Sequence, residues 1–348
     1  GMWAFLVLAC LIQKTTNSEV SFSRRHLNPE GFMTIPEITQ YWGYPSEEYQ
    51  ILTDDGYYLQ LNRIPFGKHC PQHKGPRPAV LLVHGFLWEG RCWIANLPSN
   101  SLGFFLADAG YDVWIINLRG TTWSRRHKEF SIYQQKFWNF SFHEMAIYDI
   151  PATINFILHK TKQDSLYYVG HSQGAGIGKL YNLVITFFCF SMSIKEGSNT
   201  AFSIGLNNCK KISIYPGIDQ LCLKNIFLAG GFNKKNLNVV SNYQHSMSPS
   251  DNFSAQWVIL KSHSFFFHLQ TTPPLYKIED VRVPVAVWSG GKDIATKRRN
   301  IESLITQITY LVFYTDIPDW QHFDPILGLD GVQRCYPDIL DLMQKHKH

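Results

Sequence analysis

The sequence predicts an α/β protein built on a mainly parallel sheet that helices cover on both faces. Three observations lead to this prediction. Short apolar runs rich in β-branched and aromatic residues alternate with stretches of helical spacing. One such run leads directly into Gly170-His171-Ser172-Gln173-Gly174, a pattern typical of a sharp turn from a strand into a helix. With 348 residues, 45% of them hydrophobic, the chain can also bury a core of this size.

The expected elements follow one another along the chain. Two alternating stretches within residues 49–65 surround Asp54-Asp55-Gly56 and predict a β-hairpin. Apolar runs predict buried strands at 78–85, 111–120, 165–171, 283–293 and 308–318, and helical spacing predicts helices at 100–110 and 142–161.

The region 183–281 breaks this alternation and is rich in Ser, Asn and aromatic residues. We interpret it as a shortened cap inserted into the core, over the predicted site. The core would then comprise residues 19–182 and 282–348.

The N-terminal segment predicts entry into the secretory pathway. Residues 3–12 are apolar, too short to span a bilayer, and followed by small polar residues. We expect residues 1–18 to be a signal peptide, although a strongly basic start is absent. The sequence leaves open whether the protein is secreted or lysosomal.

A secretory route makes disulfides and N-glycans available to this chain. Cys209 and Cys222 are the closest in sequence of the six cysteines outside the presumed signal, and they are the best candidates for a disulfide. Buried free thiols are the alternative. Asn139 and Asn252 each begin an Asn-x-Ser acceptor tripeptide.

The basic residues of the chain do not indicate a nucleic-acid partner. The formal charge is +5, and the small clusters at 125–128 and 297–299 are short. Nucleic-acid binding needs a concentrated basic stripe or a known motif, so we expect solvated surface charge and no nucleic-acid partner.

The Gly-x-Ser-x-Gly turn alone is weak evidence, because a reactive serine also needs a general base and an orienting acid. In α/β-hydrolases these follow the serine in the order acid, then histidine, on loops after later strands. Asp293 lies just after the apolar run 283–291, and His322 follows the strand 308–318. As alternatives, Asp293 is only a turn residue, or Asp316, Asp319 or Asp324 is the acid.

The serine also needs two backbone N–H groups directed at the developing negative charge. Gln173, which follows the serine, would supply one, and Phe86, at the end of the strand 78–85, the other. An ordinary turn at His84-Gly85 is the alternative. Gly170 and Gly174 make the tight turn, and we expect His171 to serve in packing or support.

Several long segments resemble the acid lipase family, which includes gastric lipase and lysosomal acid lipase. The matching segments are 37–65, 84–127, 140–161, 167–174, 283–293 and Gln321-His322-Phe323-Asp324, and the resemblance extends over residues 29–182 and 220–340. It implies an α/β-hydrolase core with a cap. It also implies hydrolysis of neutral-lipid esters such as triacylglycerol or cholesteryl ester at a lipid–water interface, without a cofactor, a metal or an obligate protein partner.

Matching motifs carry the family's residue roles onto this chain. Ser172 would be the nucleophile, Asp293 the acid and His322 the base, and the oxyanion hole would be lined by Phe86 and Gln173. The Cys pair of the family's cap is matched loosely by Cys209 and Cys222.

The chain also departs from the family pattern. Ser172 and Asp293 are only 121 positions apart, several dozen fewer than in typical members, and the missing part includes the next core strand and much of the cap. We hypothesise that residues 183–190 replace the lost strand. Trp88 and Glu89 stand where the family has small residues, which we expect to narrow the acyl pocket.

Two alternative functions therefore stay open. One is a non-catalytic member or isoform with a defective cap, which would gain support if the lost strand left the sheet split. The other is a different hydrolase of the same fold, such as a peptidase, because the fold alone does not set the substrate.

Overall fold

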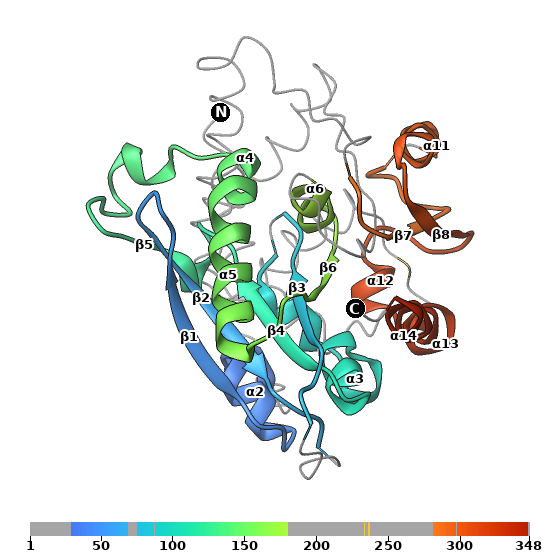
Figure 1. Cartoon of the computed structure of the whole chain (residues 1–348), viewed down its shortest axis with the longest axis horizontal. Helices are drawn as coiled ribbons and strands as arrows, with labels where there is room; N and C mark the ends of the chain where they lie inside the picture. Colours follow the sequence, from blue (N-terminus) through green and yellow to red (C-terminus); the bar gives the residue numbers. More distant parts are fainter. Residues whose placement is uncertain are drawn as a thin grey trace, which may run out of the picture.

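The computed structural model describes residues 29–68, 75–86, 88–179, 233, 236, 281–296 and 298–346. Their strands form a six-stranded mixed sheet and a separate two-stranded parallel sheet (Figure 1). The strands are β1 (Glu47–Leu52), β2 (Tyr57–Ile64), β3 (Ala79–Val83), β4 (Asp112–Asn117), β5 (Arg126–His127), β6 (Tyr167–Gly170), β7 (Val285–Gly290) and β8 (Leu311–Ile317).

Helices connect and cover these strands. The α-helices are α2 (Ile35–Tyr41), α3 (Leu102–Asp108), α4 (Phe142–Glu144), α5 (Ile150–Thr161), α6 (Gln173–Lys179), α11 (Arg298–Gln307), α12 (Asp324–Leu327), α13 (Gly331–Arg334) and α14 (Tyr336–Lys345). Short 3-10 segments are η1 (Pro29–Phe32), η2 (Gly90–Ile94), η3 (Pro98–Asn100), η4 (Thr122–Ser124) and η5 (Gln135–Trp138), and η6 (Met145–Asp149) is a π turn.

The large sheet has the strand order β1-β2-β4-β3-β6, with β5 paired to β2. The predicted hairpin is confirmed, since β1 and β2 pair antiparallel around a turn in which Gly56 has a φ of +95°. β3 lies between β4 and β6 and pairs parallel with both. The carboxyl ends of these three strands therefore meet at one edge of the sheet.

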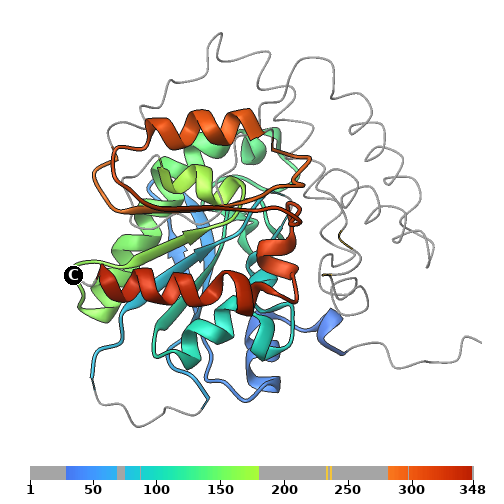
Figure 2. The same ribbon diagram turned by 90° about the vertical axis from the view of Figure 1, so that its right-hand side faces the viewer.

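Side-chain alternation along the strands divides the core between the two faces of the sheet. On β3, Leu81 and Val83 pack against α5, whereas Val80 and Leu82 pack into the cluster that contains residues of α2, α3 and α14. Figure 2 shows helices on both sides of the strands. The α/β fold with a covered sheet is thereby confirmed.

The sheet is split in the described part of the chain. β7 and β8 pair only with each other, and neither is hydrogen-bonded to β6. The small sheet nevertheless shares the main core, because Ala286 and Trp288 of β7 lie in the same apolar cluster as Tyr167 and Val169 of β6. The opposite face of β7 packs against α11. The hypothesised replacement strand at 183–190 lies outside the described residues.

The predicted helix at 142–161 is confirmed, and it contains one π-helical turn. The π turn η6 separates α4 from α5, and the Ile150 N–H bonds to the Met145 carbonyl. Pro151, in the first turn of α5, has no N–H to continue an α-helical ladder, which accounts for the interruption.

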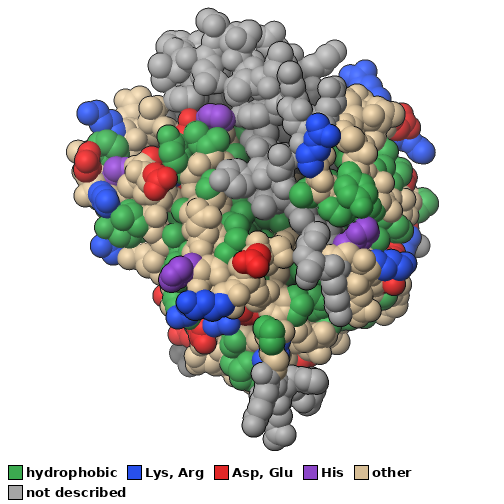
Figure 3. Space-filling view, viewed as in Figure 1, with side chains coloured by type: hydrophobic (Ala, Val, Ile, Leu, Met, Phe, Trp, Pro, Cys, Tyr) green, Lys and Arg blue, Asp and Glu red, His purple; other side chains and the backbone are tan. Residues whose placement is uncertain are grey.

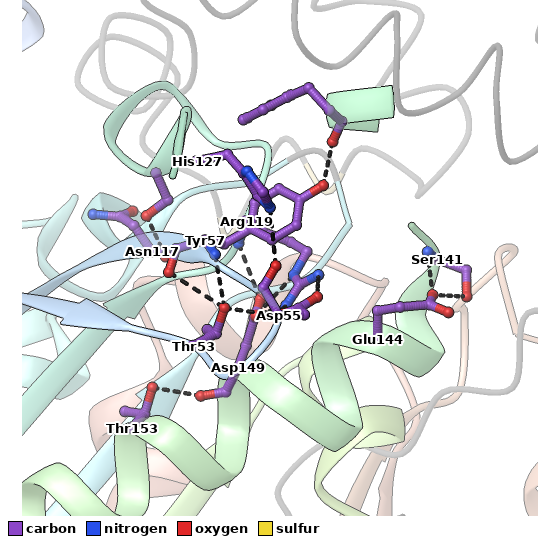
Figure 4. Close-up of polar contacts among 12 residues, drawn as sticks. Thr53, Asp55, Tyr57, Asn117, Arg119, His127, Ser141, Glu144, Asp149 and Thr153 are labelled. Atoms are coloured by element: carbon purple, nitrogen blue, oxygen red, sulfur yellow. Dashed lines mark hydrogen bonds and ion pairs between the residues drawn. The ribbon is translucent and has the colours of Figure 1, made fainter. Parts of the chain in front are cut away.

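The irregular turn brings Asp149 to a buried ion pair. Arg119 Nη2 lies 2.7 Å from Asp149 Oδ1, and Arg119 Nη1 lies 2.6 Å from Asp55 Oδ2 (Figure 4). The Arg119 guanidinium also lies 4.1 Å from the centroid of the Tyr57 ring. Three segments far apart in sequence are thus joined by one cation. Burial raises the pKa of Asp149 above its ordinary value, and the neighbouring Arg119 opposes that rise.

No helix in the described part of the chain combines the length and apolar character that crossing a bilayer requires. The described side chains also form no group of three or more His, Cys, Asp or Glu residues suited to a metal ion. The predicted signal peptide lies outside the described residues, as does the predicted cap except for Asn233, Asn236 and Val281.

Candidate active site

The predicted strand–turn–helix around Ser172 is present. β6 ends at Gly170, α6 begins at Gln173, and the two residues between them make the turn. Ser172 has a φ of +54°, in the left-handed region that residues with a side chain rarely adopt. Such strain persists where surrounding packing enforces it, and it is frequent at active sites.

Glycines permit this packing. A Cβ added to Gly170 would lie 2.5 Å from the carbonyl carbon of Gly174, and one added to Gly174 would lie 2.3 Å from the Val83 carbonyl oxygen. At Gly85 an added Cβ would lie 2.9 Å from the Ser172 Cβ. The α6 helix and the loop after β3 can therefore approach the serine only because these positions lack a side chain.

The three residues predicted as a triad lie together. His322 Nε2 is 3.2 Å from Ser172 Oγ, and His322 Nδ1 is 3.0 Å from Asp293 Oδ2. Ser172 and His322 are buried, with 5% and 9% of their surfaces exposed. An imidazole between a hydroxyl and a carboxylate can accept the hydroxyl proton while the carboxylate stabilises the resulting imidazolium.

Asp293 is itself held in place. Its Oδ1 accepts hydrogen bonds from the backbone N–H groups of Ala295 at 2.8 Å and Thr296 at 3.1 Å, which leaves Oδ2 to face the imidazole. The three alternative acids have other partners: Ser289 donates to Asp316, Arg334 pairs with Asp319, and Asn236 donates to Asp324. The geometry therefore favours Asp293 as the orienting acid.

His171 of the turn faces the histidine loop. Its Nε2 donates to the backbone carbonyl of His322 at 2.8 Å, and the two ring centroids are 4.9 Å apart. Burial lowers the pKa of His171 well below its ordinary value, and the neighbouring His322 lowers it further. His171 thus links the serine turn to the backbone of His322.

The loop after β3 is organised by His84. The backbone N–H of Leu118 donates to His84 Nε2 at 3.1 Å, so the ring proton sits on Nδ1 and donates to the Gly85 carbonyl at 2.8 Å. Burial lowers the pKa of His84 to about 4. Because a trans peptide is planar, fixing the Gly85 carbonyl directs the Phe86 N–H to the opposite side.

Trp88 and Glu89, which we expected from the sequence to narrow the acyl pocket, have different surroundings. Glu89 is buried in an ion pair with Arg91 at 2.9 Å and accepts a hydrogen bond from Trp123 Nε1 at 2.8 Å. Its charge is therefore paired with a cation. Trp88 packs against Phe323, with ring centroids 5.3 Å apart, beside the base.

The remaining predicted positions lie away from the triad. Asn139 is exposed between the buried residues Trp138 and Phe140, as a glycan acceptor would need to be. Asn252, Cys209 and Cys222 lie outside the described residues. On the face shown in Figure 3, Lys and Arg side chains are scattered among acidic and apolar ones.

A mixed sheet with a serine on the turn after a parallel strand, and an aspartate and a histidine on later loops, defines an α/β-hydrolase. The family models agree. Residues 35–97 match the partial α/β-hydrolase lipase region, and residues 78–183 match the α/β hydrolase fold. The chain also resembles an esterase from Exiguobacterium antarcticum, with a TM-score of 0.56 at 13% identity over 86% of this chain and 100% of that one.

Full-length relatives give the family. The chain is 40% identical to the human lysosomal acid lipase/cholesteryl ester hydrolase over 98% of both chains. It is 38% identical to human lipase member M, over 99% of this chain and 93% of the relative. The chain therefore belongs to the acid lipase family of α/β-hydrolases, and it is an ester hydrolase of the lipase class. This confirms the resemblance stated from the sequence.

The alignment with the human acid lipase spans 396 positions, although the present chain has 348 residues. At least 48 positions therefore have no counterpart here, which matches the scale of the deletion expected from the spacing between Ser172 and Asp293.

Proposed function

We propose that this chain hydrolyses acyl esters of neutral lipids, such as triacylglycerol or cholesteryl ester, through an acyl intermediate on Ser172. The observation that carries the proposal is the continuous contact from Ser172 Oγ through His322 to Asp293, with distances of 3.2 and 3.0 Å. Both lie within the reach expected of a nucleophile, its base and the orienting acid in a protein without substrate.

The reaction proceeds by two acyl transfers. Ser172 Oγ attacks the ester carbonyl carbon while His322 Nε2 takes the hydroxyl proton, and the imidazolium then returns that proton to the leaving alcohol. In the second step water attacks the acyl-serine and gives a proton to His322, which passes it to Ser172 Oγ as the fatty acid leaves. Asp293 keeps the imidazole proton on Nδ1 throughout, so that Nε2 is free to accept.

The oxyanion formed in each step would bind the N–H groups of Gln173 and Phe86. Gln173 is the first residue of α6, so its N–H has no acceptor within the helix. The Phe86 N–H is directed by the His84 bond to the Gly85 carbonyl. Each such donor contributes about 3 kcal/mol to transition-state stabilisation.

The proposed substrate is apolar and presented at a lipid surface. The human relative's name includes cholesteryl ester hydrolase, which supports a neutral-lipid ester as the substrate. We further propose secretion, with the lysosome as the alternative destination, and a cap formed by residues 183–281.

Covalent labelling with a fluorophosphonate probe tests the reactive serine. We expect wild-type protein to be labelled and Ser172→Ala protein to stay unlabelled at the same folded concentration. Triolein and cholesteryl oleate in emulsion then define the substrate. Labelling of both proteins would assign the reactivity to another residue and contradict the proposal.

No labelling of folded wild-type protein would contradict the proposed role of Ser172. Labelling without hydrolysis of either lipid would instead keep the triad and reject the neutral-lipid substrate.

A further inference from the structure

The loop that carries His322 contains a buried carboxylate that the mechanism leaves unused. Asp324 is 1% exposed and lies two residues after the base. Its Oδ2 accepts a hydrogen bond from the backbone N–H of Gln321 at 2.6 Å. Gln321 precedes His322 and Asp324 follows it, so this bond links the backbone on the two sides of His322.

The other oxygen of Asp324 reaches a distant part of the chain. Oδ1 accepts hydrogen bonds from Asn236 Nδ2 at 2.5 Å and Asn233 Nδ2 at 3.2 Å. The Asn236 N–H donates to the Asn233 carbonyl at 3.0 Å, so the two residues are also bonded to each other. These residues lie between the two parts of the hydrolase core in sequence.

Asn236 also binds the far end of the same loop. Its Oδ1 accepts from the Asp330 N–H at 3.1 Å, and its backbone carbonyl accepts from the Leu329 N–H at 2.8 Å. A Cβ added to Gly328 would lie 2.7 Å from Asn236 Nδ2. Asn236, which is only 8% exposed, therefore forms hydrogen bonds to Asp324, Leu329 and Asp330 of the loop from 321 to 330.

We propose that Asp324, together with Asn236 and Asn233, positions the loop that holds His322 in the triad. Asn233 and Asn236 are thereby tied to the loop that holds the general base. This inference rests on the proposed function, and it adds positioning residues that do not touch the reacting atoms.

A small displacement of the loop has a large expected effect. His322 must keep its Nε2 near Ser172 Oγ while its Nδ1 faces Asp293, and these two residues follow strands of different sheets. Misplacement of a catalytic group by about 1 Å can cost about 100-fold in rate.

The first variant is Asp324→Asn, with Asp319→Asn as the matched control. The amide in Asp324→Asn has one acceptor oxygen where the carboxylate has two. In either orientation its NH₂ group therefore faces another donor, the Gln321 N–H or the Asn236 amide. We expect kcat for p-nitrophenyl butyrate and the rate of fluorophosphonate labelling to fall by about 100-fold, with KM nearly unchanged. Asp319, two residues before this loop, has a side chain that is 56% exposed, and its variant should keep wild-type kcat.

The second variant, Asn236→Asp, keeps the shape and adds a charge against Asp324. Two carboxyls at this distance cannot both ionise easily and share a proton in acid. We therefore expect the loss of kcat relative to wild type to be largest at neutral pH and to shrink as the pH falls. Asp330 is the other carboxylate that acts on Asp324. Both proteins retain Asp330, so the comparison isolates the added charge.

The outcomes separate this inference from the proposed function. Wild-type kcat in folded Asp324→Asn protein would overturn the inference, and so would a loss in Asn236→Asp that does not change with pH. If wild-type protein is not labelled, the proposed function fails. The test then becomes the ¹⁵N resonances of the His322 ring, which should shift in Asp324→Asn and stay in place in Asp319→Asn. Unshifted resonances in Asp324→Asn would overturn the positioning role.

Discussion

The parallel strands of the two sheets differ in burial and in what they contribute to the site. Every residue of β3, β4 and β6 is buried, and the turn after β6 carries Ser172. In the small sheet β7 is almost wholly buried but β8 is mostly half-buried, and Asp293 and His322 lie on the loops after these strands. The position of Ser172 is therefore set within the large sheet, whereas that of His322 depends on how the two sheets are joined.

The joint between the sheets consists of side chains and core packing. The Tyr167 hydroxyl donates to the Met343 carbonyl at 2.6 Å, and Asn96 Nδ2 donates to the Leu327 carbonyl at 3.1 Å. Together with the His171 bond to the His322 backbone, these contacts hold the two halves where the described strands do not pair. We therefore expect catalysis to be more sensitive to substitutions at the contacts between the two sheets than to equally destabilising substitutions inside the large sheet.

Asp293→Asn should have the largest effect on activity. An amide in place of the carboxylate stabilises the wrong imidazole tautomer, and in a Ser-His-Asp triad this change lowers kcat by about 10⁴-fold. Steady-state hydrolysis of a soluble ester measures the loss. Asp316→Asn, a carboxylate on β8 that accepts from Ser289, is the control, and an equal loss there would argue against Asp293 as the orienting acid.

Truncation of one tryptophan in each sheet compares the two regions directly. Trp114 of β4 and Trp288 of β7 are both fully buried, so each change to Ala should cost about 3–5 kcal/mol of unfolding free energy. We expect only Trp288→Ala to reduce kcat in the fraction that remains folded, because it loosens the joint. Denaturant titration and labelling rates measure both quantities, and an equal fall in kcat for the two variants would contradict the comparison.

The buried His84 should make the free energy of unfolding depend on pH, which is the smallest of the expected effects. Its pKa is about 4 in the folded protein against an ordinary value of 6.5, so between these values the unfolded chain binds more protons. This contribution to stability is complete above pH 6.5 and is lost as the pH falls toward 4, with a slope of at most about 1.4 kcal/mol per pH unit. His84→Asn should flatten the acid loss measured by thermal unfolding, and the exposed His159→Asn should not.

Features with a local signal were predictable from the sequence. The apolar runs of β3, β4 and β6 and the glycines around Ser172 predicted the buried strands and the turn. Asp293 and His322 were predictable from chain order, because parallel strands bring their following loops to one edge.

Features that depend on distant partners were not predictable in this way. Asp324 appeared only as a rival acid, because its partner Asn236 lies 88 positions away with no periodic pattern to connect them. The Arg119 pair with Asp55 and Asp149 was missed for the same reason. The π turn before Pro151 was hidden by a helical spacing that continues across it.

The left-handed backbone at Ser172 has an evolutionary consequence. A residue with a Cβ pays roughly 1–2 kcal/mol in this conformation, whereas glycine adopts it freely. Ser172→Gly would therefore be expected to stabilise the fold while it abolishes the nucleophile, and a copy of this chain without selection for activity would lose nothing by that change. A serine kept at a position that favours glycine is what selection for chemistry, at the expense of stability, would leave behind.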